Sequence, residues 1–207
     1  PEFSDVVEGE VTLPPITLKQ RDLKPEYSVQ IASKSILFFN YATHSSTPAD
    51  VMKKMMEAGQ ECFQNVVDTL NERYEKFCGM VGREFKSLPW KARTMSYDQL
   101  FVEVKKEVGD KLDDMVKAYA EEVSKDDRYD VRDKAMKIVE YVHSLWSDKN
   151  PVLLVYLTPP YYPHIYVEGA RPEEKALIDA VNYAVTTTES DYKLVQKKFL
   201  PCISDLS

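Results

Sequence analysis

The stretch Asn150-Pro151-Val152-Leu153-Leu154-Val155-Tyr156-Leu157 decides the fold class. The six residues after the proline form the longest uninterrupted apolar run in the chain. Such a run predicts a β-strand that helices cover on both faces. Amphipathic helical patterns precede it at residues 131–146 and follow it at residues 172–184. A helix, a buried strand, a loop and a second helix in this order indicate an α/β arrangement.

A long helix is predicted upstream of this strand. Thr47-Pro48-Ala49-Asp50 supplies an N-cap threonine, a proline at the first helical position and an acid near the positive end of the helix dipole. Apolar residues then recur at three- and four-residue steps from Met52 to Phe77, and we interpret this stripe as core. Gly79 and Gly82 are expected to end the helix.

The other predicted elements divide the chain into three parts. Residues 1–26 hold Pro14, Pro15 and Pro25 among polar positions and predict an extended lead-in, whereas the alternating residues 27–41 predict a long strand with one buried side. The remaining predictions are a strand at 91–95 and helices at 96–108, 112–123 and 189–199. The charged run at 125–128 is interpreted as a boundary, giving predicted domains at 1–26, 27–124 and 125–207.

Composition and charge disfavour several classes of protein. The net charge of −7, from 34 acidic and 27 basic residues, gives no electrostatic reason to bind nucleic acid. No apolar run approaches the roughly 20 residues that cross a membrane. Cys62, Cys78 and Cys202 are odd in number and lack CxxC spacing, so neither a disulfide framework nor a thiolate zinc site is predicted, which fits the cytoplasm. The start Pro1-Glu2-Phe3 has no initiator methionine or leader, and we expect a piece of a longer protein.

The usual catalytic motifs do not occur in the sequence. His44, His143 and His164 are widely separated and lie in no HxD or HExxH pattern, so no metal ligands are predicted in this chain. Neither a GxSxG elbow nor a phosphate-binding GxxxxGKS loop is present. Paired acids such as Glu173-Glu174 are expected to face water. We therefore predict no catalytic residue.

The loop Thr158-Pro159-Pro160-Tyr161-Tyr162-Pro163-His164-Ile165-Tyr166 is the best local candidate for a site. It directly follows the apolar strand, and ligands of open α/β sheets bind beyond the carboxyl ends of strands. Three prolines would hold two tyrosines and a histidine in a stiff arrangement. A rigid aromatic loop packed on the surface is the structural alternative, and the sequence leaves both open.

Four ordered stretches resemble the arginine utilization protein RocB group, within the aminoacylase and carboxypeptidase-type zinc amidohydrolases. Residues 159–164 are similar to a hallmark of that group. Residues 14–23 resemble its PPxxLKxKDL segment, and Phe38-Phe39-Asn40 with Thr47-Pro48 resembles its lid strand and helix. Residues 201–207 resemble its PxISDxSY segment, although Cys202 departs from the expected residue. The resemblance spans nearly the whole chain.

This resemblance implies a two-part enzyme that hydrolyses an amide or peptide bond of a small amino-acid-derived substrate, in arginine degradation. The implied fold is α+β or α/β, a lid-type β-sheet with long flanking helices followed by part of a three-layer α/β catalytic domain. The parent would carry two zinc ions on ligands outside this chain, which alone is expected to be inactive. His164, Tyr161, Tyr162, Ser204 and Asp205 are then expected to line the cleft or orient the substrate. A homodimer through the lid is a further implication.

A binding module without enzymatic activity is the alternative function. The long helix carries several methionines near its start, and flexible methionine side chains suit adaptable protein-binding surfaces. A predicted strand edge could add to such a surface by pairing with a partner strand. A stable protein partner, with no upstream HxD region in the reading frame, would favour this alternative over the enzyme.

Overall fold

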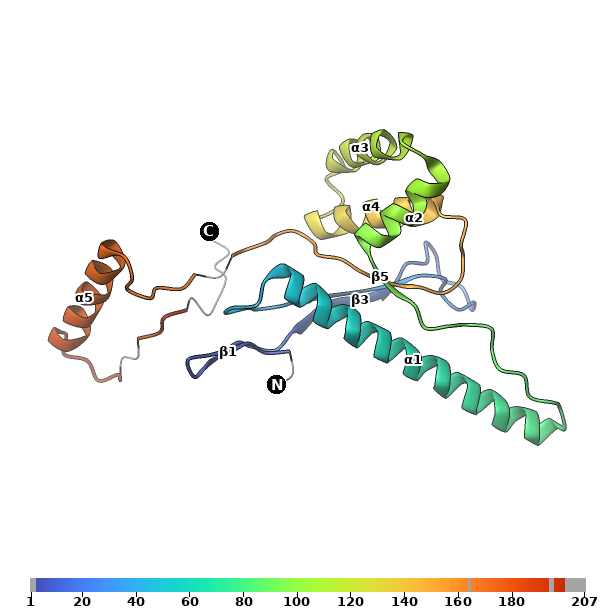
Figure 1. The fold of residues 1–207 in the computed structure, drawn as a ribbon, viewed down its shortest axis with the longest axis horizontal. Helices are drawn as coiled ribbons and strands as arrows, with labels where there is room; N and C mark the ends of the chain where they lie inside the picture. Colours follow the sequence, from blue (N-terminus) through green and yellow to red (C-terminus); the bar gives the residue numbers. More distant parts are fainter. Residues whose placement is uncertain (1–2, 164, 194–195, 200–207) are drawn as a thin grey trace. The chain divides into compact units, whose positions relative to one another are not determined.

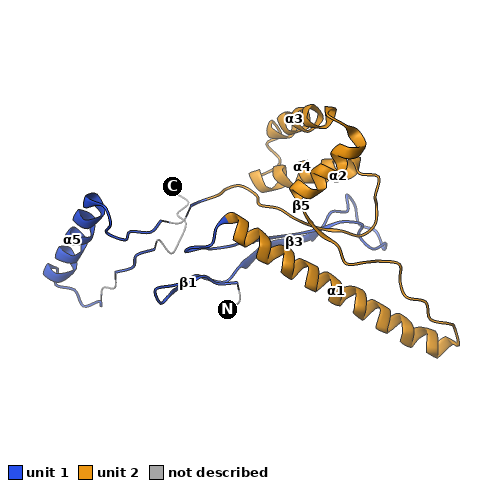
Figure 2. Ribbon diagram, in the orientation of Figure 1, with its two compact units in different colours: residues 1–47, 162–207 blue, residues 48–161 orange. Residues whose placement is uncertain are grey.

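The computed structural model describes residues 3–163, 165–193 and 196–199 of the chain. It combines helices with small two-stranded sheets, so the fold is α+β (Figure 1). Contacts group the chain into two compact units (Figure 2), which are described separately below. Residues 1–47 and 162–207 form the first unit, and residues 48–161 form the second unit. The α+β prediction is confirmed, whereas the lid and the three-layer domain stay predictions.

The first unit begins with a short hairpin. β1 (Val6–Val7) pairs antiparallel with β2 (Glu10–Val11). The two turn residues between them, Glu8 and Gly9, both have positive φ, at 50° and 83°. Positive φ at both central positions gives a turn whose twist matches the twist of the two strands. Glycine adopts this conformation without strain, and the hairpin is therefore compatible with its sequence.

The second hairpin of this unit is larger. β3 (Ile16–Asp22) pairs antiparallel with β4 (Ser35–Asn40), with a register shift between Thr17 and Lys19. The lead-in is extended, as predicted, and it contains strands. The strand predicted at 27–41 was too long, because it begins only at Ser35.

The loop between β3 and β4 explains the error in the predicted strand. Tyr27, Val29 and Ile31 are 93%, 93% and 97% exposed, so their alternation buries no face. Lys24 Nζ donates hydrogen bonds to the carbonyl oxygens of Ser28 and Gln30, so the loop curls around the ammonium group of this lysine. Backbone carbonyls used in this way are not paired with a neighbouring strand.

The second unit is organised around the long helix α1 (Pro48–Val81), which confirms the predicted helix. It continues through Gly79 and ends before Gly82, whose φ is 67°. The core interpretation of its apolar stripe was partly wrong. Its buried residues are Val51, Val67 and Cys78, whereas later stripe positions such as Phe77 are exposed.

The segment after α1 runs back along the helix (Figure 1). Leu88 N donates a hydrogen bond to Asn71 Oδ1 at 2.8 Å, and the ring of Phe85 lies 5.9 Å from the ring of Tyr74. This return brings the chain to β5 (Thr94–Ser96), which pairs in parallel with β6 (Leu153–Val155). β6 is shorter than the predicted strand, and its residues are half-buried rather than covered on both faces.

Three helices form the apolar core of the second unit. They are α2 (Tyr97–Val108), α3 (Lys111–Ser124) and α4 (Val131–Leu145), and all three were predicted. α2 starts with a capping box, in which Ser96 Oγ accepts from Gln99 N and Gln99 Oε1 accepts from Ser96 N. The core residues are Leu100, Val104, Leu112, Val142 and Trp146.

The chain ends with one confirmed helix and one wrong prediction. α5 (Pro172–Thr187) starts at residue 172, where the predicted helical pattern begins. The helix predicted at 189–199 was wrong, since the described residues of that range form bends and a single β-bridge between Phe199 and Tyr166. The boundary predicted at 125–128 lies between α3 and α4, inside the second unit. Among the described residues, no helix combines the length and the apolar character that a membrane span requires.

Candidate functional site

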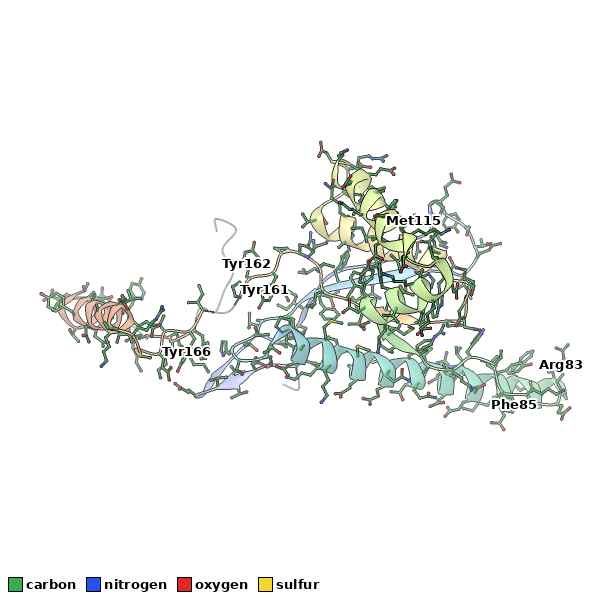
Figure 3. The ribbon with its side chains drawn as sticks, turned by 45° about the horizontal axis from the view of Figure 1, so that its top comes forward. Arg83, Phe85, Met115, Tyr161, Tyr162 and Tyr166 are labelled. Carbon is green, nitrogen blue, oxygen red and sulfur yellow. The ribbon has the colours of Figure 1, made fainter. Side chains whose placement is uncertain are left out.

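The predicted loop site is described only in part. Tyr161 and Tyr162 are 66% and 42% exposed, on the irregular segment that follows β6 (Figure 3). His164, Ser204 and Asp205 lie outside the described residues. The structure therefore leaves the cleft-lining role of all five residues a prediction.

A small cavity lies at the carboxyl ends of β5 and β6. Its volume is about 340 Å³, and residues of both strands, α1, α2 and α4 line it. Burial, with the charges of Glu140 and Asp133, raises the pKa of Tyr156 to about 12. Burial also raises the pKa of Tyr97, with a contribution from Asp98. The two phenols therefore stay protonated at neutral pH and can donate hydrogen bonds.

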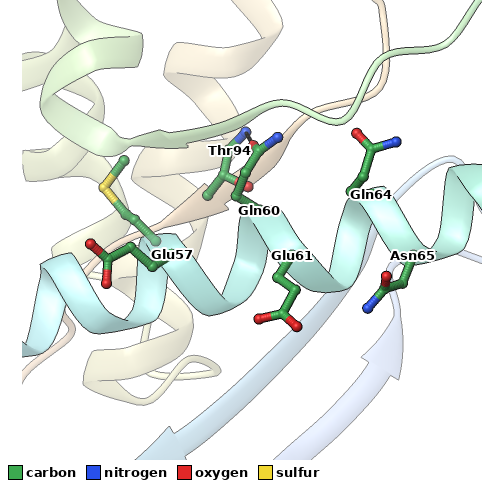
Figure 4. A pocket seen from close by; sticks show the side chains of 7 residues that line it. Glu57, Gln60, Glu61, Gln64, Asn65 and Thr94 are labelled. Atoms are coloured by element: carbon green, nitrogen blue, oxygen red, sulfur yellow. Dashed lines mark hydrogen bonds between the residues drawn. The ribbon is translucent and has the colours of Figure 1, made fainter.

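A second hollow, of about 600 Å³, runs along α1 (Figure 4). Gln60 ties the helix to the neighbouring segment: its Oε1 accepts from Thr94 N at 3.0 Å, and its Nε2 donates to Ala92 O at 3.1 Å. Glu61 points away from this contact in Figure 4. The best-placed polar group of the hollow is thus used for structure, and we assign the hollow no chemistry.

The most tightly built polar cluster is in the first unit, around the carboxylate of Asp5. Oδ2 accepts hydrogen bonds from the backbone N–H groups of His44, Ser45 and Ser46 at 3.0, 3.1 and 2.8 Å. Oδ1 accepts from Ser46 Oγ at 2.5 Å. Burial would raise the pKa of Asp5, but the four hydrogen bonds outweigh it and lower the pKa to about 2. We call this arrangement the Asp5 clamp.

The backbone that the clamp holds carries His44, which stacks on one aromatic ring that stacks in turn on another. The ring of His44 stacks on Phe199 at 4.1 Å between centroids, and Phe199 stacks on Tyr166 at 4.6 Å. His44 is only 6% exposed, and its Nδ1 has no hydrogen-bond partner among the described residues. Buried polar atoms are nearly always satisfied, so this imidazole nitrogen is an exception among the described residues. We call His44, Phe199 and Tyr166 the ring stack.

The far end of the ring stack is held by charge. Tyr166 Oη donates to Glu8 Oε1 at 3.0 Å, and Lys198 Nζ donates to Glu8 Oε2 at 2.5 Å. The hydrogen bonds from Lys198 and Tyr166 lower the pKa of Glu8. Val167 N also donates to Lys198 O, which joins the two segments that carry the stacked rings. The stack is therefore fixed at both ends.

The chain is similar to Protein RocB of Bacillus subtilis (strain 168). The two sequences are 25% identical over 205 residues, which is 98% of this chain and 36% of RocB. The uncharacterized protein YqjN of the same organism is 23% identical over 206 residues, which cover the whole chain and 37% of YqjN. The chain thus spans little more than a third of these relatives. No family model and no solved structure matches the chain.

In the sequence, His44 stands out only as a histidine without neighbouring metal ligands. The local signal was the polar run from Thr43 to Thr47 between an apolar strand and a long helix. Its partner Asp5 is 39 residues away from His44, and no sequence pattern joins the two. Among the residues that the structure describes, no group of three His, Cys, Asp or Glu side chains is placed to hold a metal ion.

Proposed function

We propose that this chain is the lid and an adjoining part of a RocB-like, metal-dependent amidohydrolase. The similarity to RocB carries this proposal, because it extends over 98% of the chain. The reaction is the hydrolysis of an amide or peptide bond in a small amino-acid-derived substrate, in arginine degradation. The enzyme is assigned to the cytoplasm, with a homodimer formed through the lid.

The metal centre is assigned to the part of the enzyme outside this chain. Two zinc ions would polarise the amide carbonyl and lower the pKa of a bound water. The described residues do not fit a zinc site, because they bring no three ligand side chains together. Their contribution is to bind and orient the substrate and to exclude water from it.

His44 is the described residue best suited to meet the substrate. Its Nδ1 is buried and has no hydrogen-bond partner among the described residues, and either a substrate oxygen or a substrate amide would suit this nitrogen as a partner. The ring stack and the Asp5 clamp fix the direction of that bond. Tyr161, Tyr162, His164, Ser204 and Asp205 remain proposed cleft residues.

The test uses the complete gene product, loaded with zinc. N-acyl amino acids, including acetylarginine, are offered as substrates and amine release is measured. We expect about two zinc ions per chain and turnover with at least one substrate. His44→Ala should lower kcat by about 10- to 100-fold, with unchanged zinc content. A zinc-free protein, or one that hydrolyses none of these amides, would contradict the proposal.

Exposed apolar residues favour the protein-binding alternative. Leu70 and Phe77 are exposed on α1, and Ile16, Leu18 and Leu37 are exposed on the hairpin of β3 and β4. Such residues are available to a partner chain. Two results would support protein binding instead of amide hydrolysis. The zinc-free protein would be recovered in a stable complex with a partner protein, and the reading frame would lack an HxD region.

A further inference from the structure

The hairpin of β1 and β2 contacts both ends of the ring stack. We infer that this hairpin positions the imidazole of His44, and that Asp5 is the positioning residue through which it acts. The inference rests on the role proposed for His44, since a fixed orientation matters only if this ring meets a substrate. Asp5 bonds to the backbone of residues 44–46 and not to the imidazole, whose Nδ1 has no hydrogen-bond partner among the described residues.

The base of the hairpin fixes Asp5 itself. Asp5 N donates to Thr12 Oγ1 at 2.8 Å, and Thr12 N donates to Asp5 O at 3.0 Å. Both residues are buried. The carboxylate cannot move away from residues 44–46 without breaking these buried bonds, which is costly. The clamp is therefore anchored in a second, independent set of hydrogen bonds.

The tip of the hairpin fixes the opposite end of the stack. The positive φ of Glu8 and Gly9 forms the tight turn between β1 and β2. Glu8 there accepts hydrogen bonds from Tyr166 and Lys198. On β2, Glu10 Oε1 accepts from Lys198 N at 3.2 Å. One short hairpin thus fixes the backbone beneath His44, the outer ring Tyr166 and the residue that precedes Phe199.

Orientation is the quantity that such a brace controls. Hydrogen bonds weaken steeply with angle, and small displacements in an active site reduce catalysis strongly. Four hydrogen bonds to one carboxylate, three of them from consecutive backbone N–H groups, leave the loop at 44–46 little freedom. Removing that carboxylate should release His44 from Phe199 without altering the imidazole chemically.

The first experiment measures the accessibility of His44 in the complete gene product and requires no activity. Diethyl pyrocarbonate modifies exposed imidazoles, and peptide mapping follows His44 with His143 of the second unit as the internal reference. Asp5→Ala should raise the rate at His44 relative to His143 by about tenfold. Asp5→Asn, whose amide oxygen can still accept backbone hydrogen bonds, should give a smaller increase. An unchanged rate in a folded Asp5→Ala protein would overturn the inference.

The matched control is Asp22→Asn. Asp22 is a carboxylate of the same unit that accepts one backbone hydrogen bond, from Lys24 N at 3.1 Å, and it lies outside the ring stack. It should leave the modification rate of His44 unchanged. Equal increases in both variants would mean that the first unit has loosened generally, and the inference would be rejected. If Asp5→Ala does not fold, Asp5→Asn and Ser46→Ala carry the same comparison.

The second experiment is a double-mutant cycle in kcat. Asp5→Ala should lower kcat by about tenfold with little change in KM, and it should have no further effect when combined with His44→Ala. Independent losses in the double variant would show a role that does not act through His44. If His44 becomes accessible in Asp5→Ala but neither substitution changes kcat, the clamp stands and the role proposed for His44 fails.

Discussion

The two units are stabilised by different kinds of interaction. In the second unit, Leu100, Val104, Leu112 and Val142 are fully buried between three helices. In the first unit, the buried set includes Asp5, Thr12 and His44 beside Phe38 and Phe199. Apolar packing depends on volume and tolerates changes of pH, whereas a buried carboxylate depends on its charge and on the geometry of its donors. The polar contacts of the first unit therefore fix the orientation of its side chains, whereas the apolar packing of the second unit provides its stability.

The largest expected effect tests the apolar core. Leu100→Ala removes a fully buried side chain from between the helices and should lower the free energy of unfolding by about 3 kcal/mol. Urea denaturation measures this loss. Leu177→Ala on α5, where the leucine is exposed, is the control and should change stability by less than about 0.5 kcal/mol. A similar small change at Leu100 would mean that the three-helix core is not close-packed.

The second prediction tests the polar cluster through pH. The pKa of Asp5 is about 2 in the folded chain against an ordinary value of 3.8. A carboxyl group with a lowered pKa stabilises the folded state above the ordinary value, and this contribution is lost as the pH falls toward the folded value. About 2 kcal/mol should therefore be present above about pH 4 and disappear toward pH 2.

Thermal unfolding between pH 2 and 6 measures this contribution when the original protein is compared with Asp5→Asn. The melting temperatures should differ most at the upper end of this range and converge near the acid end. Parallel curves over the whole range would show that the Asp5 carboxylate is not held as the structure has it.

The smallest expected effect compares two glycines of α1. An added Cβ at Gly79 would have nothing within 4 Å, so Gly79→Ala should gain up to about 1 kcal/mol from helix propensity. At Gly59 the Cβ would lie 3.1 Å from Leu153 Cδ2 and 3.3 Å from Thr94 Cγ2. Crowding there should cancel the same gain. Equal stabilisation in chemical denaturation would show that α1 does not approach the two strands closely.

Local sequence signals predicted most helices closely and the strands only in part. Caps such as Ser96 with Gln99, and Pro48 and Pro172 at helix starts, act within one turn and can be read directly. A strand needs a partner, and the apolar alternation at Tyr27, Val29 and Ile31 has none because β3 ends at Asp22. The strand prediction therefore extended too far.

The candidate site was missed for the same reason. Tyr161 and Tyr162 were found from an unusual local composition, whereas His44 acquires its environment from Asp5 and Phe199, which are far away in the sequence. Single-sequence periodicity carries no information about such contacts. Phe199 of the ring stack lies in the range that was wrongly predicted as a helix, 189–199. In the structure it forms a β-bridge with Tyr166.

The side chain of Gln60 has a consequence for how the two-stranded sheet can grow. Thr94 N and Ala92 O face away from β6, since it is Arg93 O that accepts from Leu153 N. The glutamine amide thus pairs with the outer edge of β5 as another strand would. An edge that is already paired is not available to strands of other molecules, so it does not promote aggregation. Any additional strand, whether from this polypeptide or another, has only the far side of β6 on which to pair.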